Sequence, residues 1–305
     1  MGKSFDHLPS ELVSHVTVGC GERGVTWLGE LPDTIARLEA LWSVTIDAPF
    51  PGIEFNFVAP ATTANGARVV IKIHPPWDPI EIFDEAAYLK ACDGDGCVCL
   101  LAIDAPSQSI MIERLNPGRT LIDLFAHKKS DATAPAVSVL QRITMPVSKA
   151  PANARTVDGY FKTFERYKET DFPRNYAEKA FAIYERFSRE ADRTFYIHGD
   201  FHPANVVDSD RGPYLAIDPK GIVGHIGYEI ACFLNNLNWW HEDDDVDVRP
   251  ILADAVGQVS AAFRVPAAEL RQWAYAQMVI GAWWNYADMP ELYDGSVVKA
   301  DVWDV

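Results

Sequence analysis

The chain has 305 residues, 48% of them hydrophobic and 23% charged, the balance of an ordinary globular protein with room for two lobes. Its 43 acidic and 27 basic residues give a formal charge of −16, which disfavours nucleic acid and favours a cationic small molecule, although such a surface can also serve solubility alone. No apolar run approaches the ~18 residues of a membrane span, and residues 1–15 lack a signal-type apolar region, so we expect a cytoplasmic protein without a membrane partner.

The cysteines indicate reduced thiols rather than disulfides or a metal cluster. They are unevenly spaced, and no pair has the C-x-x-C spacing of a zinc site. We therefore expect free, mostly buried side chains at Cys20, Cys92, Cys97, Cys99 and Cys232.

Residues 32–43 predict a helix, because their apolar side chains recur at helical spacing and Pro32 suits a first turn. Just upstream, Gly19–Gly24 matches the G-x-G-x-x-G dinucleotide pattern. That pattern needs a helix opening inside it and a parallel β-α-β continuation. Leu31-Pro32 should break such a helix, and no continuation follows. A dinucleotide-binding domain of this type is therefore not expected.

Residues 54–115 predict a small, mainly antiparallel α+β lobe. The expected strands are 54–60, 67–75, 97–105 and 108–115, with a helix at 79–92 and a loop at 93–96. Lys72 stands in an apolar strand, where an unpaired ammonium would be costly to bury, so it needs an anionic partner. Glu85 in the following helix is the best candidate and Glu81 the second.

Helical patterns predominate from Leu121 onward, interrupted by strand-like runs at 195–201, 205–209 and 214–219. Residues 129–140 contain proline and alanine and are typical of a connection between helices. Residues 241–248 form an acidic loop that is either a solvated face or a contact for a cationic substrate. Core packing is the expected role of the aromatic residues Trp273, Tyr275, Trp283, Trp284 and Tyr286.

The stretch YIHGDFHPANVV, residues 196–207, concentrates polar side chains between apolar flanks. Asp200 and Asn205 bracket a proline-containing loop, and Asp218 ends a further strand. Turn residues at 210–212 predict a hairpin, which would bring Asn205 and Asp218 to the same end of adjacent strands. Two carboxylates and a carboxamide supply the hard oxygen ligands that Mg²⁺ prefers.

This arrangement favours phosphoryl transfer, which needs a metal on the phosphates and a carboxylate that accepts the proton of the attacking hydroxyl. Asp-x-x-x-x-Asn followed by a strand-end Asp is the catalytic-loop pattern of protein kinases, and Lys72 in VVIK matches their phosphate-binding lysine. The Pro-Gly bend after residues 110–115 suits a hinge whose backbone binds adenine. A Walker-type P-loop is absent from the sequence.

Two other classes remain open at this point. A zinc-dependent hydrolase would use His198, His202 and Asp200, although Gly199 and Pro203 make a helix that presents both histidines implausible. A catalytically silent kinase-fold binding protein is disfavoured because the lysine, both aspartates and the asparagine are all present.

The motif H-G-D-x-x-x-x-N with a strand-end Asp resembles the aminoglycoside phosphotransferase and choline-kinase-like family. Over nearly the whole chain, segments such as GERGVTWLGELPDTIARLEALW, MIERLNPGRTL, IHGDFHPANVV and LAIDPKGIVGHIGYEIACFL are similar to the streptomycin 6-phosphotransferase and hydroxyurea phosphotransferase group. The resemblance implies a two-lobed, protein-kinase-like α+β fold. Its nucleotide-binding lobe would be 1–115, with a helical extension at 1–44, and its catalytic and substrate-binding lobe would be 116–305.

The resemblance also implies roles for single residues. Asp200 would be the catalytic base, and Asn205 and Asp218 would be Mg²⁺ ligands. Glu229 takes the place of an aspartate that supports the catalytic loop, and His225 stands where the group usually carries an acid or a small residue.

For the nucleotide, the resemblance implies ATP as cofactor. Lys72 would contact its phosphates and pair with Glu85, and the backbone from Glu113 to Leu115 would hold adenine. The phosphate-covering loop would be Pro49–Gly52, in which Gly52 is the only glycine where the group tends to have more. The expected acceptor is a small molecule, either an aminoglycoside of streptomycin type or hydroxyurea. A housekeeping small-molecule or sugar kinase is the alternative, and we expect a monomer or a weak dimer.

Overall fold

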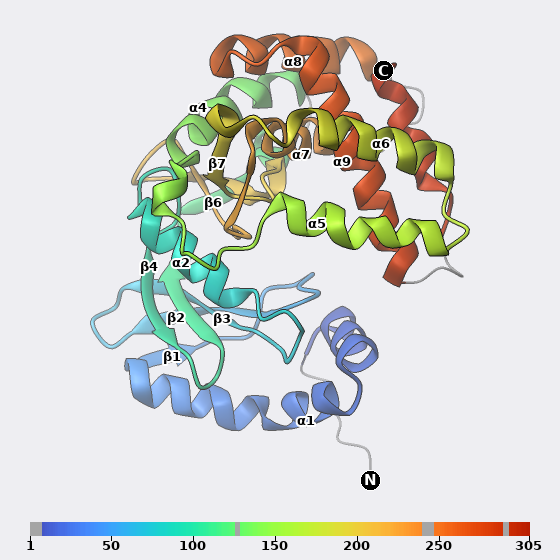
Figure 1. The fold of residues 1–305 in the computed structure, drawn as a ribbon. Coiled ribbons are helices and arrows are strands. Elements are labelled where there is room, and N and C mark those ends of the chain that lie inside the picture. The colour runs from blue at the N-terminus through green and yellow to red at the C-terminus, as the bar shows by residue number, and fades with distance from the viewer. Residues whose placement is uncertain (1–7, 126–128, 240–246, 289–292) are drawn as a thin grey trace. The chain divides into compact units, whose positions relative to one another are not determined.

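The computed structural model describes residues 8–125, 129–239, 247–288 and 293–305. The chain divides into two compact units, one formed by Met1–Gly94 with Val98–Leu115 and the other by Asp95–Cys97 with Asn116–Val305 (Figure 1). Residues 95–97, which the sequence assigned to the first lobe, therefore belong to the second unit.

The first unit is an antiparallel sheet with strand order β1-β2-β3-β5-β4 and two helices. Its elements are α1 (Ser10–Trp42), β1 (Val44–Ile46), β2 (Phe57–Thr63), β3 (Arg68–Ile73), α2 (Ile82–Cys92), β4 (Leu100–Asp104) and β5 (Ser109–Glu113). Leucines of α1 and alternate residues of β2 and β3 form one hydrophobic core. The strands and the helix expected between residues 54 and 115 are present, whereas β1 was not anticipated.

Helix α1 continues through Pro32, so the break expected there is wrong. Proline removes one hydrogen bond from a helix interior, but Leu28 and Leu38 on the same helix are fully buried, and such packing outweighs propensity. The departure from helical geometry lies instead at Gly21, with φ 57° and ψ −135°. The Gly19–Gly24 run is thus part of a kinked helix and not a dinucleotide-binding loop.

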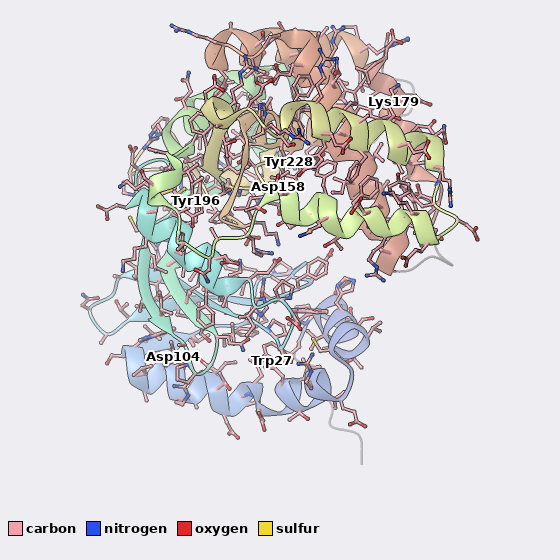
Figure 2. The ribbon with its side chains drawn as sticks, viewed as in Figure 1. Trp27, Asp104, Asp158, Lys179, Tyr196 and Tyr228 are labelled. Carbon is pink, nitrogen blue, oxygen red and sulfur yellow. The ribbon has the colours of Figure 1, made fainter. Side chains whose placement is uncertain are left out.

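An ion pair joins α1 to Asp104 of the edge strand β4, and Figure 2 labels this aspartate. Arg37 Nη2 donates to Asp104 Oδ2 at 2.6 Å, and the Ser107 N–H donates to the same oxygen at 3.0 Å. The guanidinium, with help from Ser107, lowers the pKa of Asp104 to about 2. This pair ties the last turns of α1 to the strand farthest from β1 in the sheet order.

The second unit contains two small sheets and most of the helices. Its strands are β6 (Pro117–Thr120), β7 (Thr194–Ile197), β8 (Val206–Ser209), β9 (Tyr214–Ala216) and β10 (Ile222–His225). Its helices are α3 (Leu121–Leu124), α4 (Thr133–Ile143), α5 (Val157–Phe164), α6 (Arg174–Phe187), α7 (Ile226–Trp239), α8 (Arg249–Phe263) and α9 (Ala267–Asp288). One sheet has the order β6-β8-β9, and the other pairs β7 with β10.

Helix α9 packs against α6 and α7 and forms the core of this unit (Figure 1). Trp273, Tyr275 and Trp283 are buried there, as expected, while Trp284 and Tyr286 are half-buried. None of the described helices is both long and apolar enough to span a membrane. The acidic segment 241–248 lies outside the described residues except for its last two positions.

Two segments of this unit differ from expectation. Residues 129–140, expected to connect helices, enter α4, where Pro135 stands in the first turn and needs no N–H partner. Val139 and Leu140 are buried, so the helix gains a packed face. Residues 117–120, expected as a bend, pair with β8 as the short strand β6.

Residues 95–97 are held by the second unit through backbone and side-chain hydrogen bonds. The Ala216 N–H donates to Gly96 O at 2.8 Å, and Arg211 Nη2 donates to Cys97 O at 2.8 Å. Arg142 Nε donates to Asp95 Oδ1 at 2.9 Å. All five cysteines of the chain are free, and all but Cys99 are buried, as expected.

Replacing Pro32 by alanine should raise the free energy of unfolding by about 1–3 kcal/mol, because it restores a helix hydrogen bond. Pro32 is exposed, so the change removes no buried contact. Urea denaturation followed by circular dichroism would measure this, with the exposed helix substitution Glu30→Ala as a control expected within about 0.5 kcal/mol. If Pro32→Ala were equally stable or less stable than wild type, the missing hydrogen bond at Pro32 would not destabilise α1.

Candidate active site

The loop after β7 is anchored by a buried histidine. His198 is fully buried, its Nε2 donates to Ile217 O at 2.9 Å, and its Nδ1 accepts the Asp200 N–H at 3.3 Å. Burial lowers the pKa of His198 to about 3, so the ring is neutral. Because both ring nitrogens of His198 are engaged, a zinc site at His198 and His202 is disfavoured.

The hairpin of β8 and β9 places the next two candidates. Val206 pairs with Ala216, and the Ile217 N–H donates to Asn205 O at 2.9 Å, so Asn205 and Asp218 flank the same end of the two strands. The hairpin expected from the turn residues at 210–212 is therefore present. Asp218 has φ 59°, a left-handed conformation that aspartate tolerates better than most residues.

Asn205 also closes the loop that precedes it. Its Nδ2 donates to Asp200 O at 3.0 Å, so the Asn205 side chain at the end of the loop fixes the backbone of Asp200 near its start. The Asp200 side chain is 41% exposed, with His202 Nε2 at 3.9 Å from its Oδ1. A carboxylate at residue 200 thus stays accessible on a loop whose backbone is held in place.

Glu229, on α7, holds the same loop by a hydrogen bond to its backbone. Its Oε2 accepts the Gly199 N–H at 2.7 Å, and the residue is fully buried beside Tyr228, which Figure 2 labels. Burial, aided by the charge of Asp200, raises the pKa of Glu229 from 4.5 to about 8 against the opposing backbone N–H groups. Glu229 is therefore mainly neutral at pH 7.

In the first unit, Lys72 of β3 and Glu85 of α2 form a buried ion pair. Lys72 Nζ donates to Glu85 Oε2 at 2.6 Å, and the two residues are 5% and 4% exposed. The pairing with Glu85, preferred from the sequence over Glu81, is present. Removing one partner would leave a buried, uncompensated charge, which is strongly destabilising.

The segments expected to bind adenine and phosphates lie at strand ends of this unit. Glu113 ends β5, where its N–H donates to Cys99 O at 3.0 Å and its Oε1 accepts the Cys99 N–H at 2.9 Å. Residues 49–52 lie in the loop between β1 and β2, and Gly52 has φ +71° with open space around it. A glycine there permits a turn that other residues would find strained.

Sequence reasoning missed one anchor of the second unit. Arg119 of β6 donates through Nε and Nη2 to Asp208 Oδ2 at 2.9 and 2.7 Å, and its backbone N–H donates to Asp208 Oδ1 at 2.7 Å. This ion pair ties β6 to β8, the strand that begins just after Asn205. No local pattern could have found it, because the partners are separated by 89 positions.

The family model described as "Aminoglycoside/hydroxyurea antibiotic resistance kinase" matches residues 42–288. Among curated proteins, streptomycin 6-kinase of Streptomyces griseus is 25% identical over 291 residues, 92% of each chain. Hydroxyurea phosphotransferase of Kitasatospora aureofaciens is 30% identical over 237 residues, 75% of this chain and 68% of that one.

Among solved structures, amicoumacin kinase in complex with AMP-PNP, Ca²⁺ and Ami superposes with a TM-score of 0.63 at 13% identity, over 89% of this chain and 93% of that one. At this identity the likeness concerns the fold alone, and it confirms the two-lobed, kinase-like α+β class. This chain belongs to the aminoglycoside/hydroxyurea antibiotic resistance kinase family, and it is a small-molecule kinase. The resemblance stated from the sequence is confirmed.

At pH 7, Glu229→Ala should be less stable than Glu229→Gln by about 1–3 kcal/mol. Alanine leaves the buried Gly199 N–H without an acceptor, whereas the glutamine amide oxygen replaces the neutral carboxyl. Urea denaturation of the two variants would measure the difference. Equal stability would mean that the Gly199 hydrogen bond contributes nothing.

The raised pKa of Glu229 also predicts how the stability of the protein depends on pH. Because the folded-state pKa of Glu229 is raised to about 8, its contribution to stability is fully present below 4.5 and is lost as the pH rises through 8. The amide of Glu229→Gln does not titrate. The stability of this variant relative to wild type should therefore increase between about pH 4.5 and 8, by up to about 1.4 kcal/mol per pH unit, and level off above pH 8. A difference that stays constant over this range would contradict the raised pKa.

Proposed function

We propose that this chain transfers the γ-phosphoryl group of ATP, with Mg²⁺, to a hydroxyl group of an antibiotic-type small molecule. The observation that carries the proposal is the arrangement around the β8–β9 hairpin, where Asn205 and Asp218 flank one end and Asn205 holds the loop of Asp200. Membership of the kinase family supports the reaction class.

Asp200 is the proposed catalytic base. Its carboxylate is accessible, while the backbone on both sides of it is held by Asn205 and, through Gly199, by Glu229. It would orient the acceptor hydroxyl and take its proton as the oxygen attacks the γ-phosphorus, and ADP would leave. Positioning of this kind provides much of the acceleration in phosphoryl transfer.

The residues fit a magnesium ion by their donor chemistry. Asn205 and Asp218 offer a carboxamide and a carboxylate oxygen, the hard donors that Mg²⁺ prefers, and no soft ligand is among them. Bound there, the ion would neutralise charge on the phosphate oxygens. Divalent metal and nucleotide both occur in the complex of the structurally similar amicoumacin kinase with AMP-PNP and Ca²⁺.

From the first unit, we propose that Lys72 contacts phosphate oxygens, with Glu85 holding the ammonium in place. The backbone of Glu113 to Leu115 is the proposed adenine site, and Gly52 lies in the proposed phosphate-covering loop. The Glu113 N–H already bonds to Cys99 O, so we assign adenine recognition to the remaining backbone groups of this segment.

For the acceptor, streptomycin-type aminoglycosides are the first candidate and hydroxyurea the second. The streptomycin 6-kinase match extends over 92% of both chains, and a formal charge of −16 attracts a cationic substrate. A housekeeping small-molecule kinase is the alternative within the same fold, since fold does not determine substrate.

Asp200→Asn should lower kcat by about 10²–10⁴-fold with little effect on ATP binding, because the amide cannot accept a proton. Asp218→Ala should abolish the dependence of turnover on Mg²⁺ together with most of the turnover. A coupled ADP-release assay with streptomycin, and separately with hydroxyurea, would measure both effects. Asp210→Asn is the matched control, since Asp210 is an exposed aspartate in the turn of the same hairpin and its side chain has no proposed role.

Turnover within threefold of wild type in Asp200→Asn would remove the assignment of the base. Mg²⁺-dependent turnover in Asp218→Ala would remove the metal assignment. Nucleotide binding without turnover of any hydroxylated acceptor would instead favour a silent kinase-fold binding protein.

A further inference from the structure

His225 joins the strand β10 to the helix α7. It is the last residue of β10 and stands directly before Ile226, the first residue of the helix. The side chain is 2% exposed, and its Nδ1 accepts the Gly227 N–H at 2.9 Å. By position and by bond, His225 is the N-cap of α7, where an acceptor for one of the first helical N–H groups stabilises the helix.

This hydrogen bond determines the tautomer of the ring. An Nδ1 that accepts carries no proton, so in the neutral imidazole the proton is on Nε2. Nε2 lies 3.7 Å from Glu269 Oε1 and 3.8 Å from Glu190 Oε2, a grouping that by distance alone could hold a metal ion. A protonated Nε2 is a donor and not a metal ligand, so the grouping is better explained as surroundings of the cap.

The first turn of α7 is held closely against the core. The Trp273 ring stacks on His225 with centroids 5.0 Å apart, and a Cβ on Gly227 would lie 2.2 Å from that ring. Only glycine therefore fits at 227, and its N–H is directed at Nδ1 of the cap. The position of the first turn of α7 is thus set by the packing of Gly227 against Trp273 and by the hydrogen bond from Gly227 to His225.

The same helix carries the brace of the catalytic loop. Glu229 stands four positions after His225, hence on the same face, and accepts the Gly199 N–H next to Asp200. The strand that ends in His225 also pairs with β7, with Ile222 opposite Ile197 just before the loop. A shift of the first turn of α7 would move Glu229 and, with it, the backbone of Gly199.

We propose that His225 is a positioning residue for phosphoryl transfer, which holds the first turn of α7 through Gly227 so that Glu229 keeps the Asp200 loop in its active geometry. The proposal rests on the proposed role of Asp200 as the base.

The charged groups around the ring act in opposite directions, since the carboxylates favour a protonated imidazole while burial and Arg193 favour a neutral one. Glu190, Asp192 and Arg193 face it from the segment before β7, and Glu269 faces it from α9. Burial, with the positive charge of Arg193, lowers the pKa of His225 to about 4. Protonation below that pH would occur at Nδ1 and remove the acceptor of the Gly227 N–H.

The test compares two amides that replace different ring nitrogens. In His225→Asn, the amide oxygen can occupy the place of Nδ1, and asparagine is a favoured N-cap. In His225→Gln, the longer amide reaches the place of Nε2 and leaves Gly227 without the cap. We expect Asn to keep kcat within threefold and Gln to lower it by about 5- to 30-fold, the range of a lost cap, with the KM for ATP unchanged.

Activity would be measured by ADP release with ATP, Mg²⁺ and streptomycin, and amide hydrogen exchange of peptides covering 198–201 and 226–230 would be measured without substrate. His225→Gln should speed exchange in both peptides at least fivefold, whereas His225→Asn should not. Glu269→Gln is the control, because it changes the surroundings of Nε2 and leaves the Gly227 bond intact. Asp200→Asn should lose turnover with unchanged exchange, which separates failure of the base assignment from failure of the cap.

Equal kcat and equal exchange in the Asn and Gln variants would overturn the proposal, as would faster exchange confined to 226–230. A zinc-induced rise in the melting temperature of wild type that Glu269→Gln abolishes would also overturn it, because it would place the lone pair on Nε2.

Discussion

The antiparallel pairing of β8 with β9 is the constraint on which the candidate site depends. With Val206 opposite Ala216, the residues just outside the two strands, Asn205 and Asp218, must flank the same end. A register shifted by one residue would send one of them to the opposite face of the hairpin. Arg119 reinforces this register, since its ion pair with Asp208 holds β6 against β8.

Two buried polar side chains next to this hairpin, His198 and Glu229, are kept neutral. His198 and Glu229 are fully buried, and burial shifts their pKa values in opposite directions, to about 3 and about 8, both toward the uncharged form. Each is hydrogen-bonded to backbone of the loop or of the segment beyond it. Neutral braces hold the loop without adding a fixed charge beside the phosphates that a kinase must bind.

The sequence predicted the positions of the candidate site residues better than the contacts that support them. Lys72 stands inside the apolar strand β3, whereas Asp200, Asn205 and Asp218 stand in a short loop or beside strand ends, so local patterns could place all four. The ion pair with Glu85 could be anticipated because an apolar strand cannot bury a lone ammonium. The roles of these residues in the reaction remain proposals.

What the sequence could not predict arises from contacts between distant positions. The Arg119–Asp208 pair leaves no local signal, and neither does the imidazole cap at His225, because histidine is not among the favoured N-cap residues. Local rules also gave wrong boundaries where packing outweighed them. Pro32 does not end α1, since leucines on both sides of it are buried, and Pro135 lies in the first turn of a helix in a segment expected to be a connection.

The short excursion at residues 95–97 limits how this fold can be recombined. The chain leaves the first unit after Gly94, bonds to Ala216, Arg211 and Arg142 of the second, and returns at Val98 to supply β4 and β5. A chimaera of two relatives joined once at residue 115 would therefore carry three foreign residues into the second unit. A chimaera that keeps the second unit intact needs additional junctions before residue 95 and after residue 97. Otherwise Ala216, Arg211 and Arg142 must come from the same relative as residues 95–97.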